Sequence, residues 1–551
     1  TTNFEGGLAF EMPAMEKLMT RIFSSLMGEP KFYETAEAGD NGLFADVHMA
    51  ANENPEMVLR LAAYGRQVMN MRSTPIAVLT EAAAIPACKP FVRRWTPQIV
   101  RRADEPAEVI ALWVKRHGAI GSQGKSGGEH AFPNALTRGL EDALRRFDEY
   151  QFAKYDRDGS VKLRDVLRIV RPKPQNEAQA ALYRYIVKGE VDANHLPLLT
   201  AKAALLRREK LDEEALGLAR AAHATWEVLS SKFGRSAETW NALAETLPFM
   251  AGMRNLSNIM STGANKALDR VVAMLQDARQ VQRSKQLPFR FLSAHRAVES
   301  GLRFDRKNNC QVVDEGMRNH PRRREVLDAI LTALELSAAN LPRLPGRTFV
   351  TTDNSGSMGS SVSAHSTITC QEVGNLLGAI THAMCENAIV SVFGETHAVV
   401  DLSRKDSILT NMKRLNTKDV GHSTEAWLAI RHLRDHKISV DRIVLFSDMQ
   451  CYSSAGWGGE SLAEELRKYR SAVNPNVHLH SVDLAGYGTL QFPADEKRVS
   501  LIAGWSEKVL EFLPAFEGGM RKALERIVAW TPRDHEQQDS SPDENGESET
   551  D

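Results

Sequence analysis

Three oxygen-bearing residues at alternate positions, Asp353, Ser355 and Ser357, follow a short apolar run rich in β-branched residues. At this spacing one carboxylate and two hydroxyls can lie on the same side of a tight loop. Hard oxygen donors suit Mg²⁺ or Mn²⁺, with Ca²⁺ as an alternative. Thr424 and Asp448 occur later, and Asp448 also directly follows an apolar run. We therefore expect these five residues to form one divalent cation site.

Neighbouring strands of one sheet would have to bring these residues together. Short runs rich in β-branched residues, typical of strands, occupy 347–353, 387–394, 397–402, 441–448 and 478–486. Helix-like segments, including 369–387 and 423–436, lie between most of them. This alternation predicts an α/β domain with a doubly wound, mostly parallel sheet, which binds ligands at the carboxyl ends of its strands. The alternative is a polar loop at 353–357 with Asp448 as a turn residue.

The set Asp353-x-Ser355-x-Ser357, Thr424 and Asp448 resembles the metal-ion-dependent adhesion site of von Willebrand factor A domains. The resemblance implies that the ion keeps one open position, which a carboxylate of a partner fills. Catalysis is not implied. A phosphoaspartyl enzyme would need a carboxylate at position 355, and a GxSxG nucleophile elbow would need a glycine there.

The chain before position 345 has a different pattern. From 12 to 344 the apolar residues recur at helical spacing in short blocks separated by Gly, Pro or polar residues, and no convincing alternating strand occurs. Successive helix pairs without an exact repeat predict an irregular α-solenoid, with a compact helical bundle as the alternative. The expected domains are a helical module at 1–345, the A domain at 346–533 and an acidic disordered tail at 534–551.

The formal net charge of −1 conceals an uneven distribution. Residues 534–551 carry eight carboxylates and no Lys or Arg, and residues 346–533 hold 20 basic and 21 acidic side chains. Residues 1–345 hold 49 basic and 41 acidic side chains. This surplus indicates a polyanionic partner for the helical part only.

Two basic clusters could contact that partner. The first lies within 154–173, where a helix starting near Val161 would place its arginines at i, i+4 and i+7 in a stripe that no acidic residue interrupts. Its candidate residues are Lys154, Arg164, Arg168, Arg171 and Lys173. We expect such a stripe to follow a phosphate backbone, and the alternative is a solvated helix face.

The second cluster runs from 279 to 324 and holds twelve basic and four acidic residues. Its candidate RNA-binding residues are Arg279, Arg283, Lys285, Arg290 and Arg296. Phe289, Phe291 and Phe304 lie among them, and aromatic faces with arginines suit unstacked single-stranded bases. The alternative is again a solvated helix face with buried phenylalanines.

Lys125 belongs to the segment AIGSQGKS at 119–126, which matches a relaxed phosphate-loop pattern. With Asp448 as its acidic partner, it raises the alternative of a nucleotide hydrolase. A phosphate loop must leave a strand and enter a helix, however, whereas this segment follows a predicted helix ending at Gly118 and its first glycine is replaced by alanine. Lys125 is therefore kept mainly as a candidate RNA contact in a glycine-rich loop.

The order of a helical-repeat module and an A domain resembles the Ro autoantigen family, whose helical part is the TROVE module. The likeness covers roughly 1–530 and is carried by TRGLEDAL (137–144), DVLRIVRPKP (165–174), YIVKG (185–189), ETWNALAETLPFMAGMRNLSNIM (238–260) and PFRFLSAHRA (288–297), beside the A-domain residues above. The resemblance implies a monomeric ring of HEAT-like repeats closed by the A domain, and the chain looks like a bacterial member.

The resemblance also implies a function. Members bind small noncoding Y RNA on the outer face and thread single-stranded 3′ ends of misfolded or immature structured RNAs through the ring, for quality control, ribosomal RNA maturation or decay under stress. The Y RNA role is carried by similarity to Lys154, Arg168, Arg171 and Lys173, with Arg171 standing where other members have histidine. Bacterial members are linked to exoribonucleases such as polynucleotide phosphorylase.

Two expectations complete this interpretation. The five cysteines are scattered, which fits reduced thiols in the cytoplasm, and no apolar stretch of about 18 residues is present that could span a membrane. Because no catalytic motif is met in full, we expect a binding protein rather than an enzyme. The alternative from another class is a metal-dependent protein-interaction scaffold with no RNA role.

Overall fold

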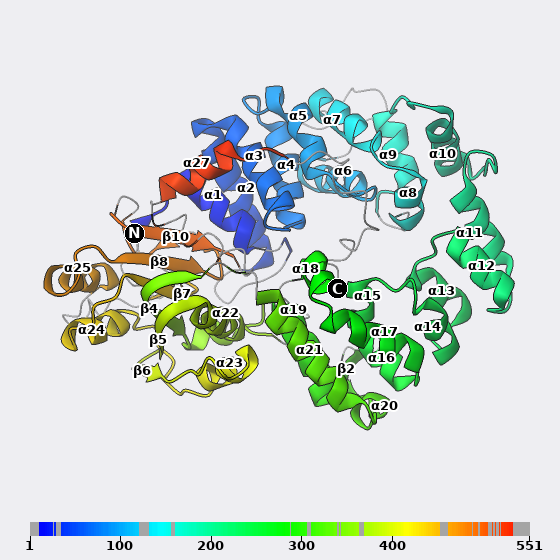
Figure 1. Ribbon diagram of the computed structural model, residues 1–551. Helices are drawn as coiled ribbons and strands as arrows, with labels where there is room; N and C mark the ends of the chain where they lie inside the picture. Colours follow the sequence, from blue (N-terminus) through cyan, green and yellow to red (C-terminus); the bar gives the residue numbers. More distant parts are fainter. Residues whose placement is uncertain are drawn as a thin grey trace.

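The computed structural model describes residues 10–25, 27–28, 35–118, 120, 132–155, 160–286, 288–305, 310–338, 341, 343–362, 368–451, 461–487, 489–493, 496–504, 510, 513, 517 and 520–532. Figure 1 shows the helices of the first part following one another around most of a ring, with a sheet domain in the remaining sector. The fold is therefore the helical-repeat ring with a doubly wound α/β domain that the sequence and its resemblance predict.

The helical part extends to Ala338. Its helices are α1 Ala14–Ser24, α2 Ala36–Glu53, α3 Pro55–Gln67, α4 Ser73–Ala84, α5 Lys89–Ile99, α6 Glu105–His117, α7 Asn134–Leu144, α8 Glu149–Tyr155, α9 Leu163–Val170, α10 Glu177–Lys188, α11 Pro197–Arg207, α12 Glu213–Ala221, α13 Trp226–Phe233, α14 Ala237–Leu243, α15 Phe249–Arg254, α16 Leu256–Ser261, α17 Asn265–Gln276, α18 Ala278–Ser284, α19 Pro288–Ser300, α20 Glu315–Arg318 and α21 Arg323–Ala338.

Helix α9 illustrates how the apolar spacing orients these helices. Leu163, Val166, Leu167 and Val170 recur at three and four residues and are all buried. They fix one face of α9 against the neighbouring helices α6, α7 and α10. The polar residues between them must therefore point to solvent.

One expectation for the helical part is wrong. Two short strands, β2 Leu302–Asp305 and β3 Cys310–Val313, pair antiparallel as a hairpin after α19. Each strand has only four residues, which is too short for an alternating pattern to be distinguished from the loops around it.

The A domain contains a six-stranded sheet in the order β10-β8-β7-β4-β5-β6. The edge strand β6 is antiparallel to β5, and every other pair is parallel. Its elements are β4 Leu344–Asp353, η1 Gly356–Gly359, α22 Cys370–Met384, β5 Cys385–Phe393, β6 His397–Val400, α23 Ile408–Asn416, α24 Trp427–Asp435, β7 Arg442–Ser447, α25 Leu462–Ala472, β8 His478–Asp483, β9 Thr489–Leu490, β10 Val499–Ala503 and α27 Met520–Ala529.

The strand order reverses between β4 and β7, which are direct neighbours although β5 and β6 separate them in the chain. In a doubly wound sheet the crevice for ligands lies at such a reversal, beyond the carboxyl ends of the strands. Asp353 ends β4 and Asp448 directly follows β7, so the fold brings both carboxylates to this position.

The beginning of the chain closes the ring on one side of the A domain. The short strand β1, Phe10–Glu11, pairs with β9. Trp530, just after α27, meets the ring of Tyr64 on α3 edge-on at 5.4 Å between centroids. Arg60 of α3 donates to the carbonyl oxygens of Val528 and Trp530, each at 2.9 Å. The end of α27 is therefore held on α3.

The last helices of the helical part close the ring on the other side. Arg296 of α19 forms an ion pair with Glu372 in the first turn of α22. Glu335 of α21 accepts a hydrogen bond from the backbone N–H of Ile408, the first residue of α23, at 2.6 Å. A carboxylate at a helix N-terminus is favourable because the first N–H groups have no partner within the helix.

Within the described part of the chain, no helix has both the length and the hydropathy needed to cross a bilayer.

Candidate functional site

The loop that follows β4 brings its predicted oxygen donors together. Asp353 is fully buried; its Oδ1 accepts from the backbone N–H of Ser355 at 2.9 Å and its Oδ2 from the hydroxyl of Ser447 at 2.6 Å. The hydroxyl oxygens of Ser355 and Ser357 are 3.4 Å apart, and both side chains are buried. The loop therefore presents one carboxylate and two hydroxyls at the carboxyl end of β4.

Asp448 places a second buried carboxylate beside this loop. Burial, followed by the negative charge of Asp353, raises the pKa of Asp448 to about 8. Burial also raises the pKa of Asp353 to about 6. Burial and mutual repulsion both disfavour the charged forms of these two carboxylates. A bound divalent cation would stabilise the charged forms.

Thr424 lies in the segment that packs against the loop 353–357. The N–H of Gly356 donates to the carbonyl oxygen of His422 at 2.9 Å, and Thr424, two residues on, is buried. The five predicted residues thus occupy the carboxyl edge of the sheet and the loops beside it. Their donor set, two carboxylates and three hydroxyls, fits a hard divalent cation.

The sequence reasoning missed two residues of this edge. Ser447 faces the same side of the sheet as Asp353 and donates to it. Asp483 ends β8, pairs with Ser447 in the register, and its charge further raises the pKa of Asp448. Both positions could have been found by extending the β4–β7–β8 register to the last residue of each strand.

Asn354 joins the loop 353–357 to two helices. Its side-chain amide donates to the carbonyl oxygen of Leu415 at 2.9 Å, and its side-chain oxygen accepts from Asn375 of α22 at 2.8 Å. Asn375 also donates to Asn416 at the end of α23 and accepts from Thr352. This buried network fixes the backbone of the loop that carries Ser355.

The first basic cluster is exposed on and after α9, but the predicted stripe is shorter than expected. The side chains of Arg164 and Arg168 are 53% and 61% exposed. Arg171 is not on the helix: it is the C-cap, in the left-handed region at φ 51° and ψ 53°. Asp165 lies 3.8 Å from Arg164 and 3.9 Å from Arg168, so an acidic residue does accompany the stripe.

The other members of this cluster lie at its two sides. Lys154, at the end of α8, is half-buried, and its ammonium group lies over the rings of Tyr150 and Tyr155 at 5.5 and 5.2 Å. Lys173 is exposed, and its backbone bonds to Glu141 and Arg145 of the α7 region. The structure therefore groups Arg164, Arg168, Arg171 and Lys173 as exposed cations.

The second cluster is divided by the structure. Arg279, Arg283 and Lys285 are exposed on α18 and at its C-cap. Arg290 is half-buried with its guanidinium 5.2 Å from the ring centre of Phe289, and Arg296 forms the ion pair with Glu372 that joins the two domains. The role of Arg296 seen here is thus structural.

The predicted stacking of bases on phenylalanines is wrong for two of the three residues. Phe289 and Phe291 are only 9% and 0% exposed because they belong to the packed side of α19. Neither ring is accessible to a base, so the buried-phenylalanine alternative holds. The side chain of Phe304 lies outside the described residues.

Lys125 also lies outside the described residues. The segment before it is helix α6, which ends at His117 and is capped by Gly118 at φ 88°. A phosphate loop would need a strand at this place. The nucleotide-hydrolase alternative therefore lacks its structural context.

Comparison with known proteins assigns both parts of the chain to families. The TROVE domain family matches residues 17–210 and 216–338, and the Ro60 vWA domain family matches residues 347–517. Telomerase protein component 1 of Mus musculus is 26% identical over 343 residues, which are 51% of this chain and 12% of that protein. RNA-binding protein RO60 of Caenorhabditis elegans is 25% identical over 238 residues, which are 42% of this chain and 34% of that protein.

The chain therefore covers about an eighth and a third, respectively, of the length of these relatives. Among solved structures, the crystal structure of Deinococcus radiodurans RO (RSR) protein superposes with a TM-score of 0.65 over 92% of this chain and 99% of that chain, at 17% identity, and has the same fold. Because the TROVE domain alone matches more than half of the residues, and the Ro60 vWA domain matches most of the remainder, the chain belongs to the Ro family.

Proposed function

We propose that the protein binds RNA through exposed cations of its helical ring. The observation that carries the proposal is the group Arg164, Arg168, Arg171 and Lys173, whose charges face solvent while the apolar face of α9 is buried. Exposed cations on this helix and directly after it can give the sequence-independent phosphate contacts that dominate affinity for nucleic acids. Membership of the Ro family, with a relative named as an RNA-binding protein, supports the same assignment.

The proposed ligands are small noncoding Y RNA and single-stranded 3′ ends of misfolded or immature structured RNAs. Burial of Phe289 and Phe291 removes two of the candidate stacking surfaces near the second cluster. Recognition there would then rest on phosphates and on the shape of the RNA rather than on base identity, so we expect weak sequence preference. The role would be RNA quality control, ribosomal RNA maturation or decay.

The test is a gel-shift series with a hairpin RNA, with and without a single-stranded 3′ tail, across a range of salt concentrations. In the variant Arg164→Gln/Arg168→Gln, the slope of log affinity against log salt should become shallower by about 0.7 to 0.9 for each phosphate that the variant no longer neutralises. The matched control is Lys405→Gln/Lys418→Gln, which neutralises two exposed lysines of the A domain. Equal slopes and affinities for both double variants and the parent would reject the α9 assignment.

The proposal also places a divalent cation, Mg²⁺ or Mn²⁺, with Asp353, Ser355, Ser357, Thr424 and Asp448. The ion would supply positive charge to two buried carboxylates and attract a carboxylate of a protein partner. An exoribonuclease such as polynucleotide phosphorylase is the kind of partner that this assignment suggests. RNA binding by the ring should persist in EDTA, whereas binding of a partner through the ion should be abolished.

The buried carboxylate pair favours one second candidate, a metal-dependent protein-interaction scaffold without an RNA role. Purified protein that retains no RNA but binds a protein in an EDTA-sensitive manner would identify it. In both cases we propose a binding protein rather than an enzyme, acting as a monomeric ring in the cytoplasm. Cys88, Cys370, Cys385 and Cys451 are buried and form no disulfide, as a reducing compartment allows.

A further inference from the structure

The A domain carries a concentrated basic surface that its overall charge conceals. Eight of its 20 basic residues lie on α24, on α25, at position 437 after α24 or in the segment 496–498 before β10. They are Arg431, Arg434, Lys437, Arg467, Lys468, Arg470, Lys497 and Arg498. Four described acidic residues accompany them: Asp435, Glu464, Glu465 and Glu496. Asp495 lies outside the described residues. We call this surface the α24–α25 face.

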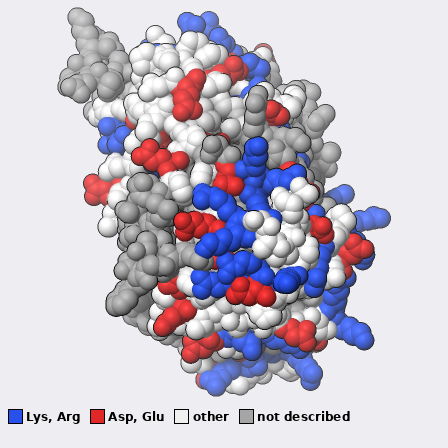
Figure 2. Space-filling view, turned by 90° about the vertical axis from the view of Figure 1, so that its left-hand side faces the viewer, with Lys and Arg blue, Asp and Glu red and all other residues white. Residues whose placement is uncertain are grey.

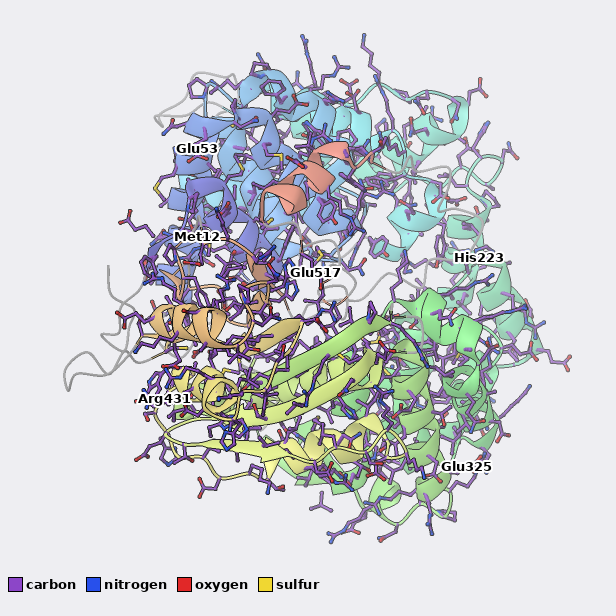
Figure 3. All side chains as sticks on the ribbon, turned by 60° about the vertical axis from the view of Figure 1, so that its left-hand side comes forward. Met12, Glu53, His223, Glu325, Arg431 and Glu517 are labelled. Atoms are coloured by element: carbon purple, nitrogen blue, oxygen red, sulfur yellow. The ribbon has the colours of Figure 1, made fainter. Side chains whose placement is uncertain are left out.

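Figure 2 shows Lys and Arg side chains gathered in the middle of the side of the molecule on which Figure 1 places α24 and α25. Figure 3 shows the labelled Arg431 on α24 at the outer edge of the A domain. The contacts between the A domain and the helical part come from α22, α23, α27, β9 and β10, whereas α24 and α25 take no part in those described above. The α24–α25 face therefore lies apart from the joints that close the ring.

Two carboxylates on this face are each shared by two arginines. Glu465, fully buried, lies 2.5 Å from Arg434 and 3.7 Å from Arg431. Glu496 lies 2.8 Å from Arg470 and 3.9 Å from Arg467. In each group the carboxylate holds both guanidinium groups in place. Asp435, 3.0 Å from Arg434, balances the charge of the Glu465 group, whereas the Glu496 group keeps a surplus of one positive charge.

Further contacts join the parts of the face into one surface. Arg470 also donates to the carbonyl oxygens of Val477 and Lys497, at 3.2 and 2.7 Å. Arg498 donates to the carbonyl oxygen of Pro475 at 3.2 Å, and its charge lowers the pKa of Arg470 after burial. Mutually repelling cations fixed at short range create a positive potential that a polyanion would relieve.

The chemistry of the face favours a phosphate backbone over a protein. Five of its eight cations are arginines, whose planar groups match phosphate oxygens. Exposed large apolar side chains, which anchor most protein interfaces, occur elsewhere among the described residues: Met49, Val114, Val187, Val191, Leu206, Val313, Val399 and Val528. Among the described residues of this face, none is an exposed large apolar side chain that could anchor an acidic protein surface.

We propose that the α24–α25 face is a second RNA-contacting surface, which binds the sugar–phosphate backbone of an RNA held by the helical ring. The inference rests on the proposed RNA-binding function and extends that function to the A domain. The nearly equal numbers of acidic and basic residues in the A domain sequence predict no polyanionic partner for it. The contacts are independent of sequence and add to those of α9 when one RNA reaches both surfaces.

The test neutralises two exposed lysines and leaves in place the arginines that hold Glu465 and Glu496. In full-length protein, Lys468→Gln/Lys497→Gln should make the salt slope for a tailed hairpin RNA shallower by about 0.7 to 0.9 for each phosphate that is no longer neutralised. The matched control is again Lys405→Gln/Lys418→Gln, which removes the same charge from other exposed positions of the A domain. The control should keep the slope of the parent.

The outcomes separate this inference from the proposed function. Tight, salt-sensitive binding by the parent, with the same slope and affinity in Lys468→Gln/Lys497→Gln, would overturn the inference and leave the ring assignment intact. No binding by the parent above the nonspecific level would overturn the proposed function itself. An equal loss in the Lys405→Gln/Lys418→Gln control would show a general effect of net charge and would also overturn the inference. Crosslinking of a 4-thiouridine-labelled hairpin to peptides of 462–472 would support it directly.

Discussion

Substitution of Arg171 by glycine should separate RNA binding from folding. Arg171 follows α9 with φ 51° and ψ 53°, and its N–H donates to the carbonyl oxygen of Leu167. A non-glycine residue in this left-handed conformation costs about 1 kcal/mol, which glycine avoids. The side chain contributes one exposed hydrogen bond, from Nε to the carbonyl oxygen of Arg168 at 3.3 Å. The backbone gain and the removal of this hydrogen bond nearly cancel, so the midpoint of thermal unfolding should not fall.

The same substitution removes one exposed cation from the proposed RNA surface. If Arg171 contacts a phosphate, the counterion released there contributes a factor of about five to affinity at about 0.15 M salt, or ~1 kcal/mol. Arg171→Gly should therefore bind a tailed hairpin RNA roughly fivefold more weakly, with the salt slope shallower by about 0.7 to 0.9. Arg171→Lys keeps the charge and should keep the slope.

Gel-shift titrations at several salt concentrations and thermal unfolding of the same preparations measure both effects. Asn70→Gly is the matched control, since Asn70 is also left-handed at φ 58° but carries no charge. An unchanged affinity in Arg171→Gly would refute the phosphate contact. A fall in the unfolding midpoint would instead refute the claim that the cap tolerates the change, and the weaker RNA binding would then have a structural cause.

Three further predictions concern the A domain. Asp448→Asn removes the repulsion with Asp353, so the thermal unfolding midpoint of this variant in EDTA should be at least that of the parent protein. The increase in the midpoint that Mg²⁺ gives the parent should be absent in the variant. An increase retained by the variant would contradict the proposed cation site. Gly486→Ala should lower the unfolding midpoint, because Gly486 has φ 66° and an added Cβ would clash with the Ser24 hydroxyl of α1. An unchanged midpoint and an unchanged proteolysis pattern would show that the contact between Gly486 and α1 can adapt to the added methyl group. Burial lowers the pKa of His480 from its ordinary value of 6.5 to about 3, so the neutral ring stabilises the fold fully above pH 6.5 and this stability is lost as the pH falls toward 3. In His480→Leu, the free energy of unfolding should fall less steeply with decreasing pH, by up to ~1.4 kcal/mol per pH unit. Urea unfolding at pH 7 and at pH 5 measures this difference. Identical pH dependences of the variant and the parent would exclude His480 as the cause.

The sequence predicts the parts of the fold that local patterns specify. The β-branched runs at 347–353, 387–394, 397–402, 441–448 and 478–486 correspond to β4, β5, β6, β7 and β8. Four of these strands lie inside the sheet, where parallel strands are rich in apolar residues, and β6 is the edge strand. The positions of Asp353 and Asp448 at strand ends follow from the same pattern, since parallel strands end at one edge. Strand β10 was missed because its run, 499–503, is short and follows two basic residues.

Features that depend on distant or junction residues were not predicted. The arginine spacing after Val161 predicts a helix that includes Arg171, yet Arg171 precedes Pro172, which disfavours the helical conformation of the residue before it. That signal was in the sequence and could have ended the helix earlier. The pairing of Arg296 with Glu372 could not be anticipated, because it joins residues on separate domains that only ring closure brings together.

The charge distribution shows why counts over a whole module mislead. The A domain holds nearly equal numbers of acidic and basic residues, but several of its carboxylates are buried at the carboxyl edge of the sheet, as Asp353, Asp448 and Asp483 are. Basic side chains, which carry long stems, remain at the surface. Folding therefore separates charges that balance along the chain, and the potential that a ligand meets depends on burial rather than on composition.

If one RNA molecule contacts both α9 and the α24–α25 face, the two surfaces act on a single binding equilibrium. Contacts that are far apart and share no partner contribute independently to the binding free energy. Neutralising Arg171 and Lys468 together should then multiply the two reductions in affinity for a long structured RNA. For an RNA too short to reach both surfaces, one of the two substitutions should have no effect. If the two surfaces bind separate RNA molecules instead, a gel shift should show two bands, one for each bound RNA. Each substitution should then weaken the formation of only one of these bands, whatever the length of the RNA.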